Sequence, residues 1–362
     1  MHHILVIGAG KIGTLITSLF ANTDDYTVHL ADIYETNPEA ARLNTLANCK
    51  YVQLDATKPD NIIAYLNQEK QISTIVSSLP YYHNAGIARI AATLELNYFD
   101  LTEDVETTET VLSLAKNAKT AFVPQCGLAP GFVSIIAHHL MQPFTTLQTV
   151  KMRVGALPTN ISNALQYSLT WSTDGLINEY GNPCVGVEDG NIVSSTPLEG
   201  LDEIKIDGLT YEAFNTSGGV GSLAKSYVHK VKHLSYKTIR YPGHCAKMKF
   251  LMNDLKLNHD RDTLKRILEN ALPKTYQDVV LVYISVTGMQ DNQWIEENYV
   301  KKFYPKKLNH HRWSAIQLTT ASSLCSVVDI VLSHPERYRG FIAQEQFSLD
   351  DFINSRFGSY YA

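Results

Sequence analysis

The chain is poor in the residues that would cross-link it or give it a strongly charged surface. It has five cysteines in 362 residues, an odd number, and no two form a Cys-x-x-Cys pair, which excludes a disulfide framework and a cysteine zinc cage. Charged residues make up 19% of the chain, and the formal net charge is −5. The hydrophobic content is that of a folded protein, while the charge disfavours an extended surface for nucleic acid or anionic membranes.

Long uninterrupted hydrophobic runs are also scarce. The N-terminus lacks the basic region and small-residue cleavage site of a signal peptide, so we expect no export. The longest apolar stretch, residues 314–333, contains Gln317 and Asp329, which would be costly in lipid. We expect it to be a buried helix of a cytoplasmic protein that has no nucleic-acid or membrane partner.

The sequence changes its rhythm near Gly127. Residues 1–127 alternate short β-branched runs with helical segments, which predicts a doubly wound parallel sheet of the Rossmann type. Residues 128–334 have longer strands and turn-rich loops, which predict an α+β domain with a mostly antiparallel or mixed sheet, and residues 335–362 are expected to return to the first domain. The expected strands are residues 3–8, 27–32, 49–55, 73–80, 98–102 and 120–127, then 146–157, 165–171, 203–207 and 279–287.

A dinucleotide-binding pattern follows the first expected strand. Gly8-Ala9-Gly10-Lys11-Ile12-Gly13 is a G-x-G-x-x-G sequence that leads into a helical run, and its glycines permit a tight turn close to a pyrophosphate. Asp32, at the end of the second expected strand, is placed to accept hydrogen bonds from an adenosine ribose. Because this acid would repel a 2′-phosphate and no arginine follows it directly, the sequence predicts NAD rather than NADP.

Two further strand ends are expected at the same edge of the sheet. Asp55-Ala56-Thr57 closes the third strand, where Asp55 is either an adenine ligand or a turn residue and Thr57 is expected to cap the next helix. Ser77-Ser78-Leu79-Pro80 closes the fourth strand, where small residues would let the nicotinamide ribose approach. His83 is expected either at the cofactor or as an ordinary residue of the first helical turn.

A second candidate site lies beyond Gly127. In Gly127-Leu128-Ala129-Pro130-Gly131, Pro130 is placed for the first turn of a helix over residues 132–141. The turn Arg240-Tyr241-Pro242-Gly243-His244 precedes a helical run over residues 246–256 with Lys247 in its first turn. Arg240, His244 and Lys247 are predicted to converge on a substrate carboxylate at a cleft between the domains, the alternative for each being a solvated surface charge.

Together these segments resemble the saccharopine dehydrogenase family, most of all its lysine 6-dehydrogenase branch. The resemblance extends over nearly the whole chain and implies an NAD(P)-dependent oxidoreductase whose second domain makes a homodimer interface. Saccharopine-forming relatives often have aspartate where this chain has Ala129, which weakens the resemblance to that branch. The segments that carry it are Gly8–Gly13, Ser77–Pro80, Cys126–Gly131, Ser168–Ser172 and Thr238–His244.

The resemblance implies oxidation of an amino acid at its side-chain amine, with L-lysine giving the 6-semialdehyde. Hydride transfer requires a neutral amine, so a base must take its proton. His244 is the first candidate for this base because the intrinsic pKa of histidine lies near neutrality, and Asp100 and Glu103 are the reserve candidates.

Arg240 and Lys247 would hold the α-carboxylate, while Trp171 and Tyr241 would line the side-chain channel or simply pack in the core. One alternative substrate is saccharopine or a carboxyalkylated polyamine, for which Arg153 or Lys225 would supply a second cation. Another alternative is a non-catalytic NAD-binding sensor.

Metal binding is not expected. The pairs His138-His139 and His310-His311 have no companion carboxylate at the H-E-x-x-H spacing.

Overall fold

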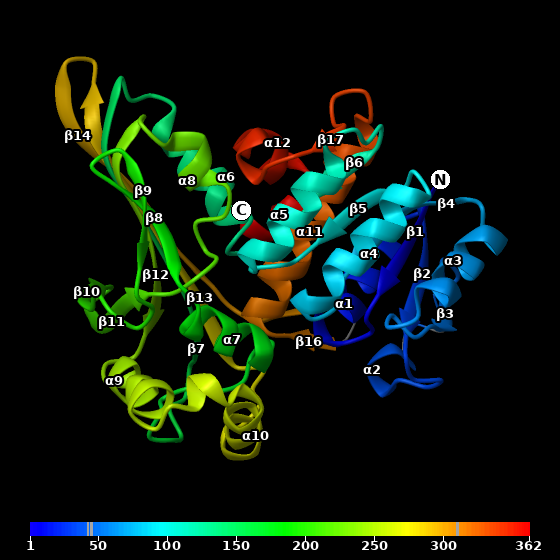
Figure 1. Ribbon diagram of the computed structural model, residues 1–362, viewed down its shortest axis with the longest axis horizontal. Coiled ribbons are helices and arrows are strands. Elements are labelled where there is room, and N and C mark those ends of the chain that lie inside the picture. Colours follow the sequence, from blue (N-terminus) through cyan, green and yellow to red (C-terminus); the bar gives the residue numbers. More distant parts are fainter. Residues whose placement is uncertain (42, 44–45, 309–310) are drawn as a thin grey trace. The chain divides into compact units, whose positions relative to one another are not determined.

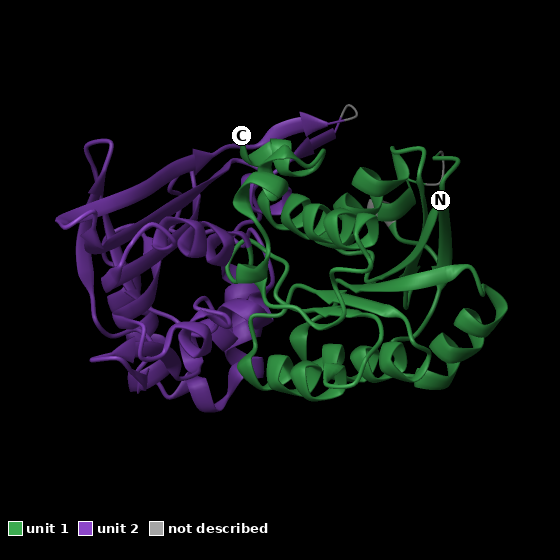
Figure 2. Cartoon of the chain, turned by 90° about the horizontal axis from the view of Figure 1, so that it is seen from above, with its two compact units in different colours: residues 1–131, 319–362 green, residues 132–318 purple. Residues whose placement is uncertain are grey.

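The computed structural model describes residues 1–41, 43, 46–308 and 311–362, so His310 lies outside the described residues. The chain divides into two compact units, with Met1–Gly131 and Thr319–Ala362 in unit 1 and Phe132–Leu318 in unit 2 (Figure 2). The expected second boundary, after residue 334, follows helix α11 (Ala315–Ser333), whereas this division assigns most of α11 to unit 1.

Unit 1 is built on a seven-stranded parallel sheet in the order β17-β6-β5-β4-β1-β2-β3 (Figure 1). Its first six strands have the doubly wound order 3-2-1-4-5-6, which confirms the predicted Rossmann-type fold. The C-terminal segment adds the seventh strand, β17, which pairs with β6. The strands are β1 (His2–Ile7), β2 (Tyr26–Asp32), β3 (Cys49–Gln53), β4 (Ile72–Ser77), β5 (Asn97–Asp100), β6 (Ala121–Val123) and β17 (Gly340–Phe341).

Helices cover both faces of this sheet. Alternate side chains of β1, Leu5 and Ile7, belong to one core cluster with buried residues of α3 (Pro59–Gln68), α4 (Tyr81–Thr93) and α5 (Val105–Ala115). The intervening side chains of β1 point to the opposite face, where α1 (Lys11–Ala21) packs against β1 and β2. This arrangement explains why the central strand β1 is apolar from Ile4 to Ile7. The short helices of unit 1 are α2 (Pro38–Ala41) and α12 (Leu349–Asn354).

Unit 2 contains a mixed sheet with the strand order β10-β11-β12-β7-β13-β14, and β8 and β9 extend it from β12. The pair β7–β12 is parallel and its neighbours are antiparallel, as the prediction of a mixed sheet requires. The strands are β7 (Thr146–Pro158), β8 (Cys184–Glu188), β9 (Asn191–Ser195), β10 (Asp202–Ile206), β11 (Leu209–Asn215), β12 (Val231–Arg240), β13 (Asp278–Gln290) and β14 (Gln293–Phe303). A separate hairpin consists of β15 (Lys306–Leu308) and β16 (His311–Trp313).

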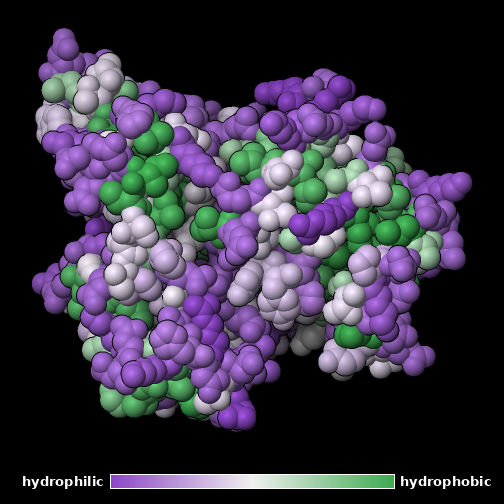
Figure 3. All heavy atoms as spheres, viewed as in Figure 1, coloured by the Kyte–Doolittle hydropathy of each residue, from purple (hydrophilic) through white to green (hydrophobic). Residues whose placement is uncertain are grey.

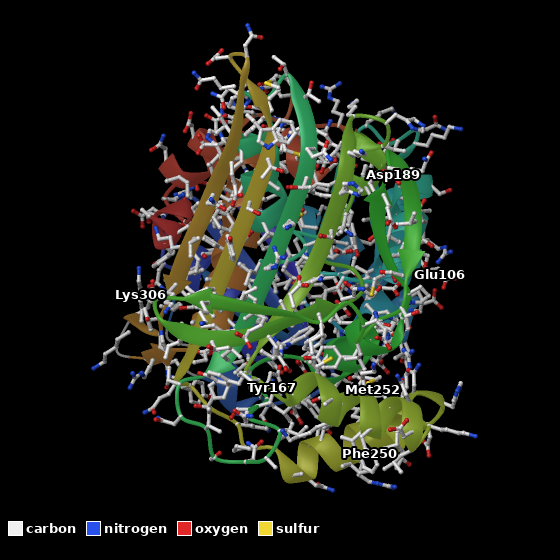
Figure 4. All side chains as sticks on the ribbon, turned by 90° about the vertical axis from the view of Figure 1, so that its left-hand side faces the viewer. Glu106, Tyr167, Asp189, Phe250, Met252 and Lys306 are labelled. Atoms are coloured by element: carbon white, nitrogen blue, oxygen red, sulfur yellow. The ribbon has the colours of Figure 1, made fainter. Side chains whose placement is uncertain are left out.

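One face of the unit 2 sheet is covered by α6 (Phe132–Met141), which packs against β7, β13 and β14. At one end of the sheet, a second apolar cluster joins residues of α7 (Thr173–Gly181), α9 (His244–Lys249) and α10 (Arg261–Ala271). Figure 4 shows Tyr167 of this cluster between the long strands and the helical segment that carries Met252 and Phe250. The remaining short helix is α8 (Leu223–Tyr227).

Two local predictions in unit 2 are wrong. Residues 165–171, all of which the structure describes, form no strand, because Gln166 has a φ of +53° and only Leu169 makes an isolated bridge, to Lys274. The helix expected over residues 246–256 begins earlier, at His244, and continues as a π-helix over Phe250–Asp254.

The apolar stretch near residue 320 forms helix α11. By length and composition it is apolar enough to cross a membrane, but 89% of the apolar window is buried inside the structure, as in the core helix of a folded domain. On the face drawn in Figure 3, hydrophobic residues of the described chain form separate patches between hydrophilic ones.

Candidate functional site

The glycine loop between β1 and α1 is tightly packed on the protein side and open on the other. Gly8 has a φ of +104°, and a Cβ on Gly13 would lie 1.9 Å from the Gly8 carbonyl oxygen, so both positions require glycine. A Cβ on Gly10 would meet no protein atom within 4 Å. Gly10 is exposed and directly precedes α1, so the loop leaves space for a phosphate at the N-terminus of a helix.

Asp32 lies beside this loop at the C-terminal end of β2. Its Oδ2 accepts a 2.7 Å hydrogen bond from the backbone N–H of Ala9, and its Oδ1 accepts one of 3.3 Å from the N–H of Tyr34. The carboxylate is thus fixed next to the turn that would hold the pyrophosphate, where the adenosine ribose of a dinucleotide lies in this fold. Lys11 and Ile12 begin α1 and are both half-buried.

Asp55 adopts the turn role. Its Oδ1 accepts hydrogen bonds from the hydroxyl of Thr57 at 2.6 Å and from the N–H of Thr57 at 2.9 Å. The bond from the Thr57 hydroxyl is the main cause that holds the pKa of Asp55 below its usual range. The prediction that Thr57 caps the next helix is wrong, because the residue before α3 is Lys58 and no side chain caps that end. Ala56 packs at the edge of the unit 1 core.

The end of β4 lies directly beside the glycine loop. The Ser78 N–H donates to the Ile7 carbonyl at 2.9 Å, and a Cβ on Gly8 would lie 2.8 Å from the Ser78 carbonyl oxygen. Ser77 is buried, and its hydroxyl donates to Asn84 Oδ1 at 2.7 Å. Leu79, Pro80 and His83 follow and are half-buried, and burial lowers the pKa of His83. The structure therefore brings the predicted cofactor residues at β1, β2 and β4 to one edge of the sheet.

The two reserve bases stand at the end of β5. Asp100 is 0% exposed, and its carboxylate accepts hydrogen bonds from the Tyr98 hydroxyl at 2.7 Å, the Thr102 N–H at 2.9 Å and the Gln125 N–H at 3.0 Å. Burial raises the pKa of Asp100 to about 6. These contacts describe a scaffold carboxylate that joins β5 to the start of the next loop, while Glu103 lies half-buried three residues later.

The turn after β6 is compact. A Cβ on Gly131 would lie 1.9 Å from the Gly127 carbonyl oxygen, and the Ala129–Pro130 peptide bond is cis. Helix α6 begins at Phe132, so the prediction that Pro130 stands in its first turn is wrong.

In unit 2, Arg240 is the last residue of β12, and only 3% of it is exposed. Its Nε donates to the Tyr180 hydroxyl at 2.8 Å, its Nη1 donates to the Ile239 carbonyl at 2.9 Å, and its guanidinium lies 5.0 Å from the centre of the Tyr167 ring. Among the described residues, no carboxylate oxygen lies within 4.0 Å of a nitrogen of this guanidinium, so Arg240 forms no ion pair there. Arg240 is therefore a buried cation without a counter-ion in direct contact.

His244 begins α9 and is 1% exposed. Its Nδ1 lies 2.7 Å from the Leu165 carbonyl oxygen and its Nε2 lies 3.1 Å from the Tyr180 hydroxyl. Burial, with a further contribution from Arg240, lowers the pKa of His244 to about 3. The reason for choosing His244 as the base, a pKa near neutrality, is therefore contradicted by its surroundings.

The other predicted substrate residues do not converge. Lys247 turns back, and its Nζ donates to the Gly243 carbonyl at 3.0 Å. Trp171 donates from Nε1 to the Tyr167 hydroxyl at 3.0 Å and packs against the apolar cluster of α7, α9 and α10. Tyr241 packs in a different cluster and donates to the Pro158 carbonyl at 2.9 Å. Because Tyr241 follows the end of β12 and packs in a different cluster from Trp171, the two side chains do not line one channel.

Two residues of this cluster were missed by sequence reasoning. Tyr180 links Arg240 to His244, and Glu212 of β11 accepts hydrogen bonds from the N–H groups of Gly243 at 2.7 Å and Cys245 at 2.5 Å. In the register of β11 and β12, Glu212 lies opposite Arg240, and its hydrogen bonds fix the turn that leads into α9. Neither residue belongs to a local motif, so only the pairing of distant strands and helices reveals them.

Among the described residues, no group of three or more histidine, cysteine, aspartate or glutamate side chains is arranged to hold a metal ion.

Comparisons with known proteins give a consistent result. The sequence matches the saccharopine dehydrogenase NADP binding domain over residues 4–123 and the saccharopine dehydrogenase C-terminal domain over residues 127–357. The mitochondrial alpha-aminoadipic semialdehyde synthase of Bos taurus is 19% identical over 311 residues, which cover 83% of this chain and 33% of that protein. The chain thus spans about a third of the length of this curated relative.

Two solved structures share the fold. Apo saccharopine dehydrogenase (L-Glu forming) from Saccharomyces cerevisiae has a TM-score of 0.76 at 16% identity and covers 97% of this chain and 95% of its own. The homospermidine synthase of Legionella pneumophila, solved in complex with NAD, has a TM-score of 0.68 at 13% identity and covers 99% of this chain and 89% of its own. At these identities, the likeness shows the fold alone.

Proposed function

Because the chain belongs to the saccharopine dehydrogenase family, whose two domain descriptions cover most of it, we propose that this oxidoreductase oxidises an amino acid at its side-chain amine, with L-lysine as the first candidate. The observation that carries the proposal is Arg240, a buried guanidinium with no carboxylate in ion-pair contact among the described residues. Burial of a charge without an ion-pair contact is costly, and Glu179 acts on Arg240 only from beyond ion-pair distance, so a ligand is expected to supply a direct opposite charge. An α-carboxylate is an anion of suitable size and geometry.

The nucleotide would be held by the glycine loop Gly8–Gly13, by Asp32 and by the Ser77–Pro80 strand end, which fit a dinucleotide because Gly10 leaves open space at a helix N-terminus. When bound, an oxidised nicotinamide accepts a hydride from the carbon that bears the substrate nitrogen. One amine proton leaves to a base or to water. Hydrolysis of the resulting imine would give the 6-semialdehyde and ammonia. We propose NAD as the preferred cofactor.

His244 is a poor candidate for the base, because its Nε2 faces the Tyr180 hydroxyl and its pKa is lowered to about 3 by burial. Asp100 and Glu103 remain the candidates. The pKa of Asp100 is raised to about 6 by burial, which brings it into the range of a base at neutral pH, although its carboxylate already accepts three hydrogen bonds.

Saccharopine or a carboxyalkylated polyamine is the second candidate substrate, because the similar proteins include a saccharopine dehydrogenase and a homospermidine synthase. It would need a second cation beside Arg240. Arg153 does not meet this need, because it pairs across the sheet with Lys237, three residues before Arg240, and so points to the opposite face. There its Nη2 donates to Asp202 at 3.1 Å. The position of Arg153 counts against a substrate with two carboxylates, whereas Lys225, exposed on α8, stays a candidate for the second cation.

The direct experiment follows reduced nicotinamide by absorbance with lysine, saccharopine and a polyamine, each with NAD and with NADP. We expect turnover with lysine and NAD. If only saccharopine is turned over, saccharopine and not lysine is the substrate. Absence of turnover with every amine, in protein that binds the dinucleotide, would favour the non-catalytic sensor.

A further inference from the structure

A buried chain of hydrogen bonds connects Arg240 to the backbone of a distant loop. Arg240 Nε donates to the Tyr180 hydroxyl at 2.8 Å, the Tyr180 hydroxyl lies 3.1 Å from His244 Nε2, and His244 Nδ1 lies 2.7 Å from the Leu165 carbonyl oxygen. Arg240, Tyr180 and His244 are each at most 3% exposed. Four groups from different parts of the chain, β12, α7, α9 and the loop before residue 167, thus meet in one network.

The proton positions in this chain follow from its two ends. A carbonyl oxygen accepts only, so His244 Nδ1 must carry the proton that bonds to Leu165. The guanidinium donates only, so the Tyr180 oxygen must accept from Arg240. Because His244 is neutral and its proton lies on Nδ1, its Nε2 has no proton and accepts from the phenolic O–H. The low pKa of His244, caused mainly by burial, agrees with this neutral form.

The chain determines which edge of Arg240 remains available. A guanidinium has five N–H groups, and two of them are used by Tyr180 and the Ile239 carbonyl, so 5 − 2 = 3 have no acceptor among the described residues. Because Nε is occupied, the side edge formed by Nε and Nη2 is closed to a carboxylate. The end of the fork formed by Nη1 and Nη2 is the edge that can still make a two-point contact.

We infer that Tyr180 and neutral His244 are positioning residues that orient Arg240 and thereby make the enzyme selective for amines that carry an α-carboxylate. This inference rests on the proposed function, since it assigns the substrate preference of the same site. The fixed tautomer of His244 acts through Tyr180. A phenol whose proton is held by His244 presents its lone pair to Arg240, whereas a freely rotating phenol would present its proton for part of the time.

The surrounding residues leave little room for another role. The ring of His244 lies between aromatic neighbours, with ring centres 5.4 Å from Tyr167, 5.8 Å from Tyr180 and 6.3 Å from Phe214. Glu212 holds the N–H groups on both sides of His244. A polar chain inside an apolar cluster is costly compared with apolar packing, so its presence calls for a gain that packing does not give.

The test compares lysine with cadaverine, the diamine that remains when the carboxylate of lysine is removed. In the intact protein with NAD, kcat/KM should favour lysine. In Tyr180→Phe, we expect kcat/KM for lysine to fall about 10-fold, mainly through a higher KM, while the value for cadaverine stays within about 2-fold. His244→Phe should change the same ratio in the same direction, because it removes the acceptor of the Tyr180 proton.

Tyr167→Phe is the matched control. It removes a phenolic hydroxyl from an equally buried tyrosine of the same cluster, but that hydroxyl accepts from Trp171 and lies outside the chain. Its lysine-to-cadaverine ratio should stay that of the wild type. Equal losses for both substrates in Tyr180→Phe, or a wild-type ratio in that variant, would overturn the inference.

A second measurement does not depend on turnover, so it separates failure of this inference from failure of the proposed function. Two-bond ¹H–¹⁵N correlation spectra of the histidine rings, assigned with a His244→Phe sample, report which ring nitrogen carries the proton. His244 should show the Nδ1–H tautomer without titration between about pH 5 and 8. Titration in that range, or the Nε2–H tautomer, would refute the positioning role even if lysine is oxidised.

Discussion

Asp32 links the glycine loop to the choice of cofactor. Its Oδ2 is bound to the Ala9 N–H, so the negative charge is held beside the turn rather than free to swing away. We therefore predict that the protein binds NADH more tightly than NADPH. Asp32→Asn keeps an acceptor for the Ala9 N–H and removes the charge. It should therefore reduce the ratio of NADPH to NADH dissociation constants by about 10-fold, mainly because NADPH binds more tightly. Fluorescence titration of both reduced cofactors measures this, and tighter NADPH binding in the wild type would contradict it.

The buried, neutral state of His244 has a consequence for stability. Its pKa is lowered from 6.5 to about 3 in the folded protein, with burial as the largest cause. Above about pH 6.5 the folded and unfolded states both hold it neutral, whereas below this pH only the unfolded state gains the proton. The contribution of His244 to stability is therefore complete above its unfolded pKa and is lost as the pH falls toward the folded value.

We predict that replacing His244 by Phe reduces the loss of unfolding free energy between pH 7 and pH 5 by about 1–2 kcal/mol. The variant itself can be less stable at both pH values, since the comparison uses only the difference. Urea unfolding at the two pH values gives this difference. An identical pH dependence in wild type and variant would show that His244 titrates normally in the folded state.

In the turn between β1 and α1, one glycine leaves space for the cofactor and another is required by the packing of the protein itself. A Cβ at Gly10 meets no protein atom within 4 Å, whereas one at Gly13 lies 1.9 Å from the Gly8 carbonyl oxygen. We predict that the unfolding free energy of Gly10→Ala stays within about 1 kcal/mol of the wild-type value, while its dinucleotide affinity falls. Gly13→Ala should lose affinity and, in addition, about 1–3 kcal/mol of unfolding free energy. Denaturant unfolding and cofactor titration of the two variants check this. Unchanged affinity in Gly10→Ala would place the pyrophosphate elsewhere.

Elements formed by local patterns could be predicted from the sequence. The strands of unit 1 are short runs of β-branched residues that end at Gly8, Asp32 or Ser77, and a buried parallel strand needs no more than that. Residues 165–171 have a similar apolar content, but Gln166 takes a left-handed conformation and its side chain donates to the Pro242 carbonyl. The same apolar residues then pack against helices instead of joining a sheet, a distinction that composition does not contain.

The substrate cluster could be predicted only in part. Arg240 and His244 stand in one recognisable turn, which is why both were found. Tyr180 stands 60 residues before Arg240 in the sequence, and it joins them only because α7 packs beside the end of β12. The protonation of His244 was misjudged for the same reason, since the pKa of an imidazole depends on burial that distant segments create.

At the scale of the whole molecule, one face of the unit 2 sheet is covered by α6, and the second face is open along β14, although Leu281 and Arg153 of the neighbouring strands are buried on it. Val150, Met152 and Ile284 are 0% exposed on the face where α6 packs. The register places Tyr283 opposite Val300 and beside Arg153 on the other face, and there Val300 is 51% exposed. Trp294, which shares this face of β14, is 60% exposed. A sheet face with exposed apolar side chains is expected to be covered by a partner.

We predict that a second copy of the chain covers this face, giving a homodimer in solution. An isologous interface brings the same patch of both subunits together, so charges introduced there meet their own copies and repel. The double variant Val300→Lys and Trp294→Lys should therefore shift the mass measured by light scattering toward that of the 40.5 kDa chain at micromolar concentration. Dinucleotide affinity should stay that of the wild type, since both substitutions lie in unit 2.

Phe250→Lys is the control, because Phe250 is an equally exposed apolar residue, at 53%, on the helical segment of the same unit. A wild-type protein that is monomeric throughout this concentration range, or a control variant that dissociates as fully as the double variant, would contradict an interface on the open face.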